Sequence, residues 1–301
     1  MGLSIKNIKK WWRMIRGKSL LHVEQGKGKI YSFSSVQGYY NDLTNKVLLD
    51  EEIYNSTEIV KYNKKGNYFP ISVFQYGLGC YDLYLQDKDK NLMKSKFLKY
   101  LDWTFTHQQD DGSWLNFIDD YPDHPYSSMA QGEGASLLIR GFVLTGQIKY
   151  LEAAKKALIF MLKPLSEGGT CAEDNENLIL YEFTFLPYVY NGWIFSIFGL
   201  MDYCIQTNDM FFQEKLNKTI LTLSQVVGGM DNGYWSMYRN DKTIASPFYH
   251  HLHIAQLQVL YEYTKIDIFK ETADKFLNYE NSKKNRKKAF QKKALQKIFS
   301  R

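Results

Sequence analysis

Apolar residues recur with a period near 3.6 along most of the chain after Pro70, a spacing typical of amphipathic helices. Four such segments begin near Val73, Gly134, Trp193 and His250. Each ends in a short polar break, and a second segment with the same periodicity follows the break. The pattern therefore predicts four helical hairpins.

The polar breaks recur at a nearly constant spacing. Asp87, Thr145, Thr207 and Thr264 mark equivalent turns, which lie 58, 62 and 57 residues apart. A helical pair cannot bury its apolar face alone, so pairs repeated at a fixed period stack on their neighbours. We predict a mainly α fold, an α/α toroid or incomplete α/α barrel of about four helical hairpins.

The segment before the hairpins has a different pattern. Short aromatic and β-branched runs, with Gly38 and residues 63–67 as breakers, favour a few extended pieces. We therefore divide the chain into four parts. They are a basic amphipathic N-terminal segment at 1–20, a short extended/β segment packed on the toroid at 21–70, the toroid at 71–279, and a basic tail at 280–301.

Three long connections join the second helix of one pair to the first helix of the next. They cover residues 107–131, 164–191 and 228–249, and hairpin topology places them at the same end of the toroid. They are rich in aromatic, carboxylate and amide side chains. Rings stack on the C–H faces of sugars, and polar side chains hydrogen-bond to sugar hydroxyls, so these loops favour a carbohydrate-active protein.

Positive charge is concentrated at the two ends of the chain. Residues 1–20 carry six basic and no acidic residues, and residues 280–301 carry nine basic residues against Glu280. The chain has a net charge of +6, but the body at 21–279 has a net charge of −8. The overall charge therefore does not indicate a nucleic-acid-binding fold, and we predict no nucleic-acid partner.

The N-terminal segment and the cysteines bear on localisation. A helix there would place Ile5, Ile8, Trp12 and Ile15 on one face, as in helices that lie on anionic membranes. A helix docked on its own body, or a solvated arm, is the alternative. The first twenty residues lack the continuous apolar run of a signal peptide, so we expect none, and we expect no membrane-spanning segment. The three cysteines form no CxxC motif. We predict a cytoplasmic protein, peripheral at the inner face of the membrane if the N-terminal helix binds there.

Several motifs resemble the C-terminal domain of the D-glucuronyl C5-epimerase family. They are SMAQGEGASLLIRGFVLTGQIKYLEAA (Ser128–Ala154), NGWIFSIFGLMDY (Asn191–Tyr203), SPFYHHLHIAQLQVLY (Ser246–Tyr261), FPISVFQYGL (Phe69–Leu78) and WSMY (Trp235–Tyr238). The resemblance spans about residues 68–278. It implies an isomerase that converts D-glucuronic to L-iduronic acid residues in a heparan- or heparosan-like polysaccharide. Our first hypothesis is a cofactor-independent epimerase that acts on a surface or capsular glycan, and the basic N-terminus and the expected cytoplasmic location favour a lipid-linked substrate.

The resemblance also implies the catalytic residues. Epimerisation removes the proton at C5 and returns one to the opposite face, so it requires two proton carriers and a neutralised carboxylate. The tyrosines of the family correspond to Tyr238 in WSMY and Tyr249 in SPFYHHLH. When the family motif is aligned without gaps, a third tyrosine of the family corresponds to Tyr181. Aligning the glutamate–tyrosine pair of the family instead selects Glu182, with Phe183 in place of the tyrosine.

Other side chains are candidates for substrate binding. Gln131 and Asn191 suit sugar hydroxyl or carboxylate groups, but both also suit helix capping. Arg239 and Lys242 are the cations nearest to Tyr238 in the sequence, and the alternative is that they are solvated loop charges. The predicted substrate-binding set is Tyr76, Trp114, Gln131, Asn191, Arg239, Lys242, His250 and His253.

Neither Arg140 nor the pair of histidines predicts a metal site. Arg140 lies in the middle of a predicted helix, and we expect it to be structural. His250 and His253 have no nearby cysteine or carboxylate to complete a metal site, so we predict no metal. We also predict no cofactor.

Three other functions fit the same loops. A uronate lyase shares C5 proton removal but expels the group at C4. A glycoside hydrolase would use paired carboxylates from among Asp119, Glu133 and Glu182. A non-catalytic glycan-binding protein would keep the groove without the chemistry. In each case the expected partner is an acidic polysaccharide or glycolipid-linked glycan, and a homodimer is a further expectation.

Overall fold

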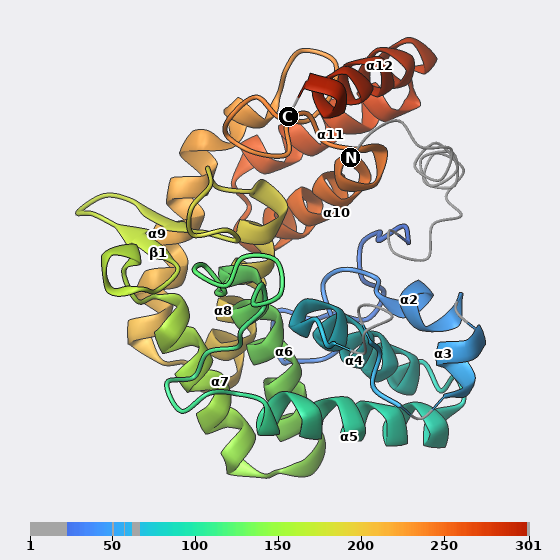
Figure 1. Cartoon of the computed structure of the whole chain (residues 1–301), viewed down its shortest axis with the longest axis vertical. Helices are drawn as coiled ribbons and strands as arrows, with labels where there is room; N and C mark the ends of the chain where they lie inside the picture. Colours follow the sequence, from blue (N-terminus) through green and yellow to red (C-terminus); the bar gives the residue numbers. More distant parts are fainter. Residues whose placement is uncertain (1–22, 50, 57, 62–66, 300–301) are drawn as a thin grey trace. The chain divides into compact units, whose positions relative to one another are not determined.

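The computed structural model describes residues 23–49, 51–56, 58–61 and 67–299, and it confirms the mainly α fold (Figure 1). The predicted amphipathic segment at 1–20 lies outside the described residues. The four predicted hairpins are present. They are α4 (Pro70–Leu85) with α5 (Lys90–Thr106), α6 (Ser128–Thr145) with α7 (Ile148–Met161), α8 (Tyr190–Thr207) with α9 (Met210–Val226), and α10 (Pro247–Thr264) with α11 (Asp267–Asn281).

The recurring threonines have a physical role in the turns. Thr145, Thr207 and Thr264 each end the first helix of a hairpin, where the hydroxyl donates to the carbonyl four residues earlier. The same hydroxyl accepts a hydrogen bond from the backbone N–H two residues later. The residue between is in the left-handed conformation at Gly146 (φ +70°) and Asn208 (φ +53°), as is common where helices end.

The chain forms two compact units. The hairpin unit runs from Gly28 to Leu223. The terminal unit combines the stretch that ends at Lys27 with the chain from Ser224 onward. The first three hairpins thus belong to the hairpin unit, apart from the last residues of α9, and α10 and α11 belong to the terminal unit.

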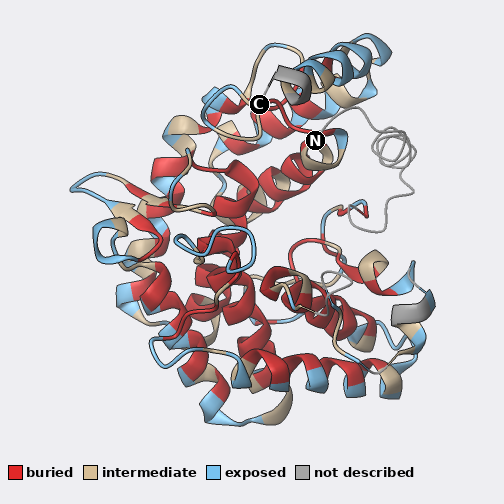
Figure 2. Cartoon of the chain, viewed as in Figure 1, coloured by how far each residue is buried: buried red, intermediate tan, exposed pale blue. Residues whose placement is uncertain are grey.

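The hairpin unit has two layers of helices. In the inner layer α6 packs between α4 and α8, and α5 and α7 pack on the outside of α4 and α6. Residues 128–141 of α6 and 190–204 of α8 are buried all round, whereas α5 and α7 expose one side (Figure 2). Helices that are buried on every side carry the core of such a unit.

α6 and α8 approach closely because glycines face each other between them. A Cβ atom added at Gly199 would lie 2.5 Å from the carbonyl oxygen of Gly132. A Cβ atom at Gly132 would lie 2.7 Å from the Cα atom of Ser196. These neighbours are backbone atoms, which cannot move aside as a side chain can, so the contact requires glycine at both positions.

We expect Gly199→Ala to lower the free energy of unfolding by about 1–3 kcal/mol, because the added methyl group overpacks this contact. Chemical denaturation measures the loss. Gly228→Ala is the matched control, since an added Cβ atom there meets no atom within 4 Å, and it should leave stability nearly unchanged. Equal effects of the two substitutions would contradict the close approach of α6 and α8.

The segment predicted as extended is irregular and contains two short helices that the pattern did not predict. Within its described part, Gly28 N–H donates to Tyr40 O and Gly38 N–H donates to Ile30 O, as in a loose hairpin. Helices α2 (Thr44–Leu48) and α3 (Glu51–Asn55) follow, and α2 packs on α4. The named strands, β1 (Cys171–Glu173) and β2 (Leu178–Leu180), form an antiparallel pair in the second long connection.

The terminal unit shows that the predicted basic tail requires correction. Most of residues 280–301 form helix α12 (Lys283–Phe299), which lies beside α11 (Figure 1). Its Ala289 is buried in a cluster with Trp235, Ile244 and Ala245 of the third long connection. The tail is therefore part of the folded unit. Among the described residues, no helix combines the length and apolar character needed to cross a bilayer.

Candidate active site

The terminal unit brings the two best-matched tyrosines together. Tyr238 lies in the connection between η2 (Val227–Met230) and α10, and Tyr249 lies in the first turn of α10. Their ring centroids are 4.6 Å apart, and both side chains are half-buried. The Tyr238 N–H donates to Thr243 O at 2.7 Å, and Ser246 Oγ caps α10 by accepting from Tyr249 N–H. A turn and a helix cap thus position the pair.

A buried polar network holds the WSMY segment on α10. His250 Nδ1 accepts from Ser236 N–H at 3.1 Å, and His250 Nε2 donates to Phe276 O at 3.0 Å. Ser236 Oγ lies 2.8 Å from His250 Nδ1 and 2.9 Å from His253 Nδ1. The indole of Trp235 stacks on the His250 ring, with centroids 3.6 Å apart.

These contacts correct the predicted substrate-binding role of the two histidines. Both are fully buried. Burial lowers the pKa of His250 to about 4 and that of His253 to about 3, so both rings are neutral near pH 7. His250 and His253 therefore hold the WSMY segment through buried contacts with Ser236, and neither ring is exposed at the surface. Nε2 of His253 has no hydrogen-bond partner within the described residues. Within the described residues, no group of three or more His, Cys, Asp and Glu side chains is arranged to hold a metal ion.

The predicted cations near Tyr238 have different surroundings. Arg239 pairs with Asp241 at 2.7 Å, so its charge is already compensated within the loop. Lys242 is exposed on a turn with φ +66°. A cation that the sequence interpretation missed lies next to Tyr238 instead, since Lys293 Nζ of α12 is 5.7 Å from the centre of the Tyr238 ring. It lies 55 positions away from Tyr238 in the sequence, so no local motif could reveal it.

The hairpin unit positions Tyr181 and Glu182 directly after β2. The backbone of Tyr181 is held by Thr170 O and by the N–H of Ser128 at the start of α6, both at 2.9 Å. Its ring is half-buried. Burial, together with the nearby Cys171, raises the pKa of Tyr181, which favours the protonated phenol. Tyr181 therefore stays a phenol near neutral pH.

Amide side chains predicted to bind substrate lie near the starts of the inner helices. Ser127 caps α6 through its side chain, and Val189 occupies the cap position of α8, so neither Gln131 nor Asn191 is a helix cap. Both are buried. The amide oxygen and nitrogen of Gln131 have no hydrogen-bond partner within the described residues. Buried amides without partners are rare, so Gln131 stays a candidate for binding a polar ligand.

Two carboxyl groups lie near each other in this unit. A Cβ atom at Gly192 would lie 2.3 Å from Glu182 Oε2, so glycine makes room for this carboxyl at the start of α8. Glu133 Oε1 accepts from Gln75 Nε2 at 2.8 Å, and Glu133 Oε2 has no partner within the described residues. Burial raises the pKa of Glu133 to about 8, and the charge of Glu182 adds to the rise. Glu133 thus holds its proton near pH 7.

The raised pKa of Glu133 predicts how stability depends on pH. The unfolded carboxyl ionises above its ordinary value of 4.5, whereas the folded one stays protonated up to about pH 8. Folding therefore becomes less favourable as the pH rises from 4.5 to 8. Glu133→Gln keeps an acceptor for Gln75 and removes the ionisation. Between pH 5 and pH 8 the variant should therefore lose about 1–3 kcal/mol less of its free energy of unfolding than the wild type does.

Denaturation of wild type and variant at both pH values measures this difference. The exposed Glu214→Gln serves as the control and should leave the pH dependence as it is in the wild type. If Glu133→Gln behaved in the same way as this control, Glu133 would be ionised in the folded protein.

Two predicted binding residues are corrected to core residues. Trp114 is 1% exposed, packs over Gly134, and donates from Nε1 to Thr104 O at 3.0 Å. Its faces are covered, so it is no platform for a sugar. Tyr76 is also buried, with its ring stacked on Tyr100 of α5. Their predicted role rests on motif or loop position, and such a position does not reveal which rings point into the core.

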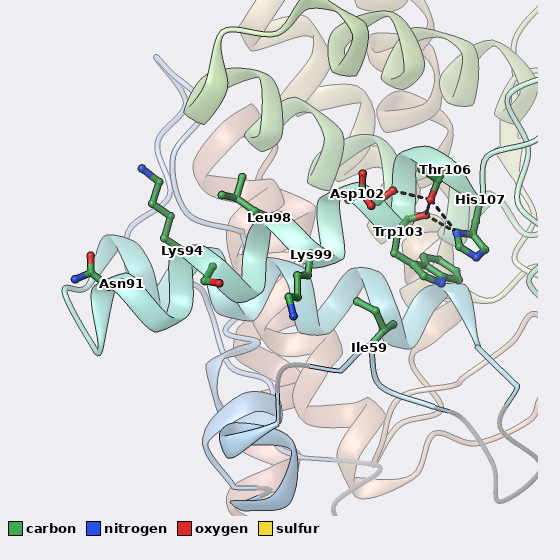
Figure 3. A pocket seen from close by; sticks show the side chains of 10 residues that line it. Ile59, Asn91, Lys94, Leu98, Lys99, Asp102, Trp103, Thr106 and His107 are labelled. Carbon is green, nitrogen blue, oxygen red and sulfur yellow. Dashed lines mark hydrogen bonds between the residues drawn. The ribbon is translucent and has the colours of Figure 1, made fainter.

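A hollow of 730 Å³ lies on the exposed side of α5 (Figure 3). Its lining includes Lys94, Lys99, Asp102 and Trp103 of α5, with Ile59 beside them. No predicted site residue lines it. The hollow therefore does not extend the candidate site.

Comparison with known proteins agrees with the motifs. The model of the family described as "D-glucuronyl C5-epimerase C-terminus" matches residues 110–278. The D-glucuronyl C5-epimerase of Caenorhabditis elegans is 27% identical over 217 residues, with 62% of this chain and 35% of that protein covered. The chain thus matches about a third of the length of this relative. Helix α12 lies after the range that the family model matches.

Proposed function

Because the chain belongs to the D-glucuronyl C5-epimerase family by its C-terminal domain, we propose that it inverts C5 of D-glucuronic acid residues in a glycan, giving L-iduronic acid. The observation that carries the proposal is the contact between Tyr238 and Tyr249. Both correspond to tyrosines of the family motifs, both are half-buried, and a capped helix and a hydrogen-bonded turn fix their positions.

The chemistry requires a base, an acid and a cation. The base removes the C5 proton, the negative charge spreads onto the uronate carboxylate, and the acid returns a proton to the opposite face of C5. We assign proton transfer to Tyr238 and Tyr249. Tyr181 is a third candidate carrier, and its raised pKa keeps it in the phenol form near neutral pH. Glu182 is the alternative to Tyr181 in the other alignment of the family motif.

The substrate we propose is an anionic polymer or lipid-linked glycan that contains glucuronic acid. Gln131 and Asn191 are candidates for its hydroxyl groups. Within the loop, Lys242 is the candidate for its carboxylate, since Arg239 is already paired with Asp241. We propose a cytoplasmic place of action, motivated by three buried free thiols, Cys80, Cys171 and Cys204.

Product analysis tests the proposal. The purified chain is incubated with an unsulfated polymer of glucuronic acid and N-acetylglucosamine, and the products are examined by NMR. Iduronate signals without new chain ends are the expected result. An unsaturated uronate, detected by its ultraviolet absorbance, would identify a lyase, and new saturated reducing ends would identify a hydrolase. A polymer that is bound but unchanged would indicate a glycan-binding protein.

A further inference from the structure

Helix α12 is fixed against the loop that carries Tyr238. Ala289 is 2% exposed in the cluster with Trp235, Ile244 and Ala245. Gln296 accepts from Ile244 N–H at 3.0 Å and donates to Lys242 O at 2.9 Å, and Lys293 donates to Ile244 O at 2.5 Å. The helix therefore has a defined face toward the loop.

The cations next to this face lie over aromatic rings of the same loop. Lys288 Nζ is 3.8 Å from the centre of the Tyr234 ring, and Lys293 Nζ is 5.7 Å from that of Tyr238. At about 100° per residue, Lys288, Lys292 and Lys293 lie on the Ala289 side of α12. Another three lysines lie on the opposite side, at positions 283, 284 and 287.

Helix α12 concentrates positive charge beside the loop. The helix carries eight basic residues and no acidic one. The acidic groups around the loop have other partners, since Asp231 pairs with Lys275, Asp241 with Arg239 and Glu280 with His251. Among the described residues, Lys288 and Lys292 form no ion pair. A concentrated positive surface therefore adjoins the candidate proton carriers, and most of it is exposed (Figure 2).

We propose that the lysines flanking the docked Ala289 face of α12, Lys288, Lys292 and Lys293, bind the anionic saccharide chain next to Tyr238, with Lys293 as the cation for a uronate carboxylate. The position of Lys293 against the reacting tyrosine supports this role, and the identity of the saccharide rests on the proposed function. An anionic membrane is the less favoured partner. The exposed apolar side chains Phe290 and Leu295 lie on different sides of α12, so its described side chains form no apolar stripe for a bilayer.

The test compares two triple variants of the full chain that remove the same charge. The loop-side variant is Lys288→Gln/Lys292→Gln/Lys293→Gln, and the matched control is Lys283→Gln/Lys284→Gln/Lys287→Gln. Binding of the unsulfated glucuronate polymer is measured by calorimetry at constant ionic strength. We expect the loop-side variant to bind about tenfold more weakly and the control less than about twofold more weakly.

Because Lys293 also bonds to the loop backbone, Lys288→Gln/Lys292→Gln is tested as well, and we expect a loss of about threefold without unfolding. Equal losses in both triple variants would show that only net charge matters and would overturn the proposal. Binding to phosphatidylglycerol vesicles is measured in parallel. The proposal would also be overturned if the loop-side variant bound the polymer as the wild type does but lost binding to the vesicles, or if the wild type did not bind the polymer. Binding needs no turnover, so this surface is tested even if the wild type forms no iduronate.

Discussion

Tyr238→Phe is expected to lower the rate of iduronate formation by about 10²–10⁴-fold, the range typical for loss of a general acid or base. The substitution removes only the hydroxyl that we propose exchanges the proton. The ring, its contact with Tyr249 at 4.6 Å and the backbone bond to Thr243 do not depend on that hydroxyl. The affinity for the polymer should therefore change little while turnover falls. NMR of the product over time, with calorimetry of binding, separates the two quantities.

Tyr261→Phe is the matched control. Tyr261 lies on α10 in the same unit and is half-buried like Tyr238, but the proposed chemistry gives it no part. We expect this variant to keep the wild-type rate. If Tyr238→Phe retained full turnover, Tyr238 would not be a proton carrier, and Tyr249 and Tyr181 would be the candidates that remain.

Arg140→Met is expected to lower the free energy of unfolding by about 3–5 kcal/mol, because it leaves a buried carboxylate without its partner. Arg140 and Asp202 are both at most 1% exposed and are joined at 2.6 Å between α6 and α8. Arg140 also donates to Gly38 O at 2.9 Å, which ties the N-terminal segment of the hairpin unit to the inner helices. Asp82 is buried close by, and burial raises its pKa to about 7 despite the charge of Arg140.

The double variant Arg140→Met/Asp202→Leu should recover a large part of that loss, since replacing both buried charges by apolar groups is often nearly neutral. Lys155→Met is the control, because the Lys155–Asp209 pair at 3.4 Å is largely exposed and contributes less than about 1 kcal/mol. Chemical denaturation measures the free energy of unfolding of the two single variants and the double variant. A loss for Arg140→Met as small as that for Lys155→Met would contradict the structural role of the buried pair.

The hairpins were predictable because the signal is local and repeated. Thr145, Thr207 and Thr264 each close a turn through the same two hydrogen bonds, so one physical device appears three times at a regular spacing. The inner helices are different. Their full burial depends on glycine contacts such as that of Gly132 with Gly199, and such a contact cannot be seen until the helices are paired.

The sequence motifs select the candidate tyrosines, but they do not show which of the neighbouring side chains are buried by packing. Motif positions identified Tyr238 and Tyr249, and the structure places their rings in contact. The same motif also suggested His250 as a ligand-binding residue, but both of its nitrogens are used inside the protein. The basic run of α12 has little apolar periodicity, so its docking through Ala289 could not be read from the sequence.

The most direct test of the proposed chemistry is deuterium exchange at C5. Wild type and the Tyr238→Phe/Tyr249→Phe variant are incubated with the glucuronate polymer in deuterated water, and C5 is monitored by NMR. With wild type we expect deuterium at C5 in both the remaining glucuronate and the new iduronate residues, and with the variant we expect none. Polymer that binds to the wild type but keeps every C5 proton would contradict the proposed chemistry.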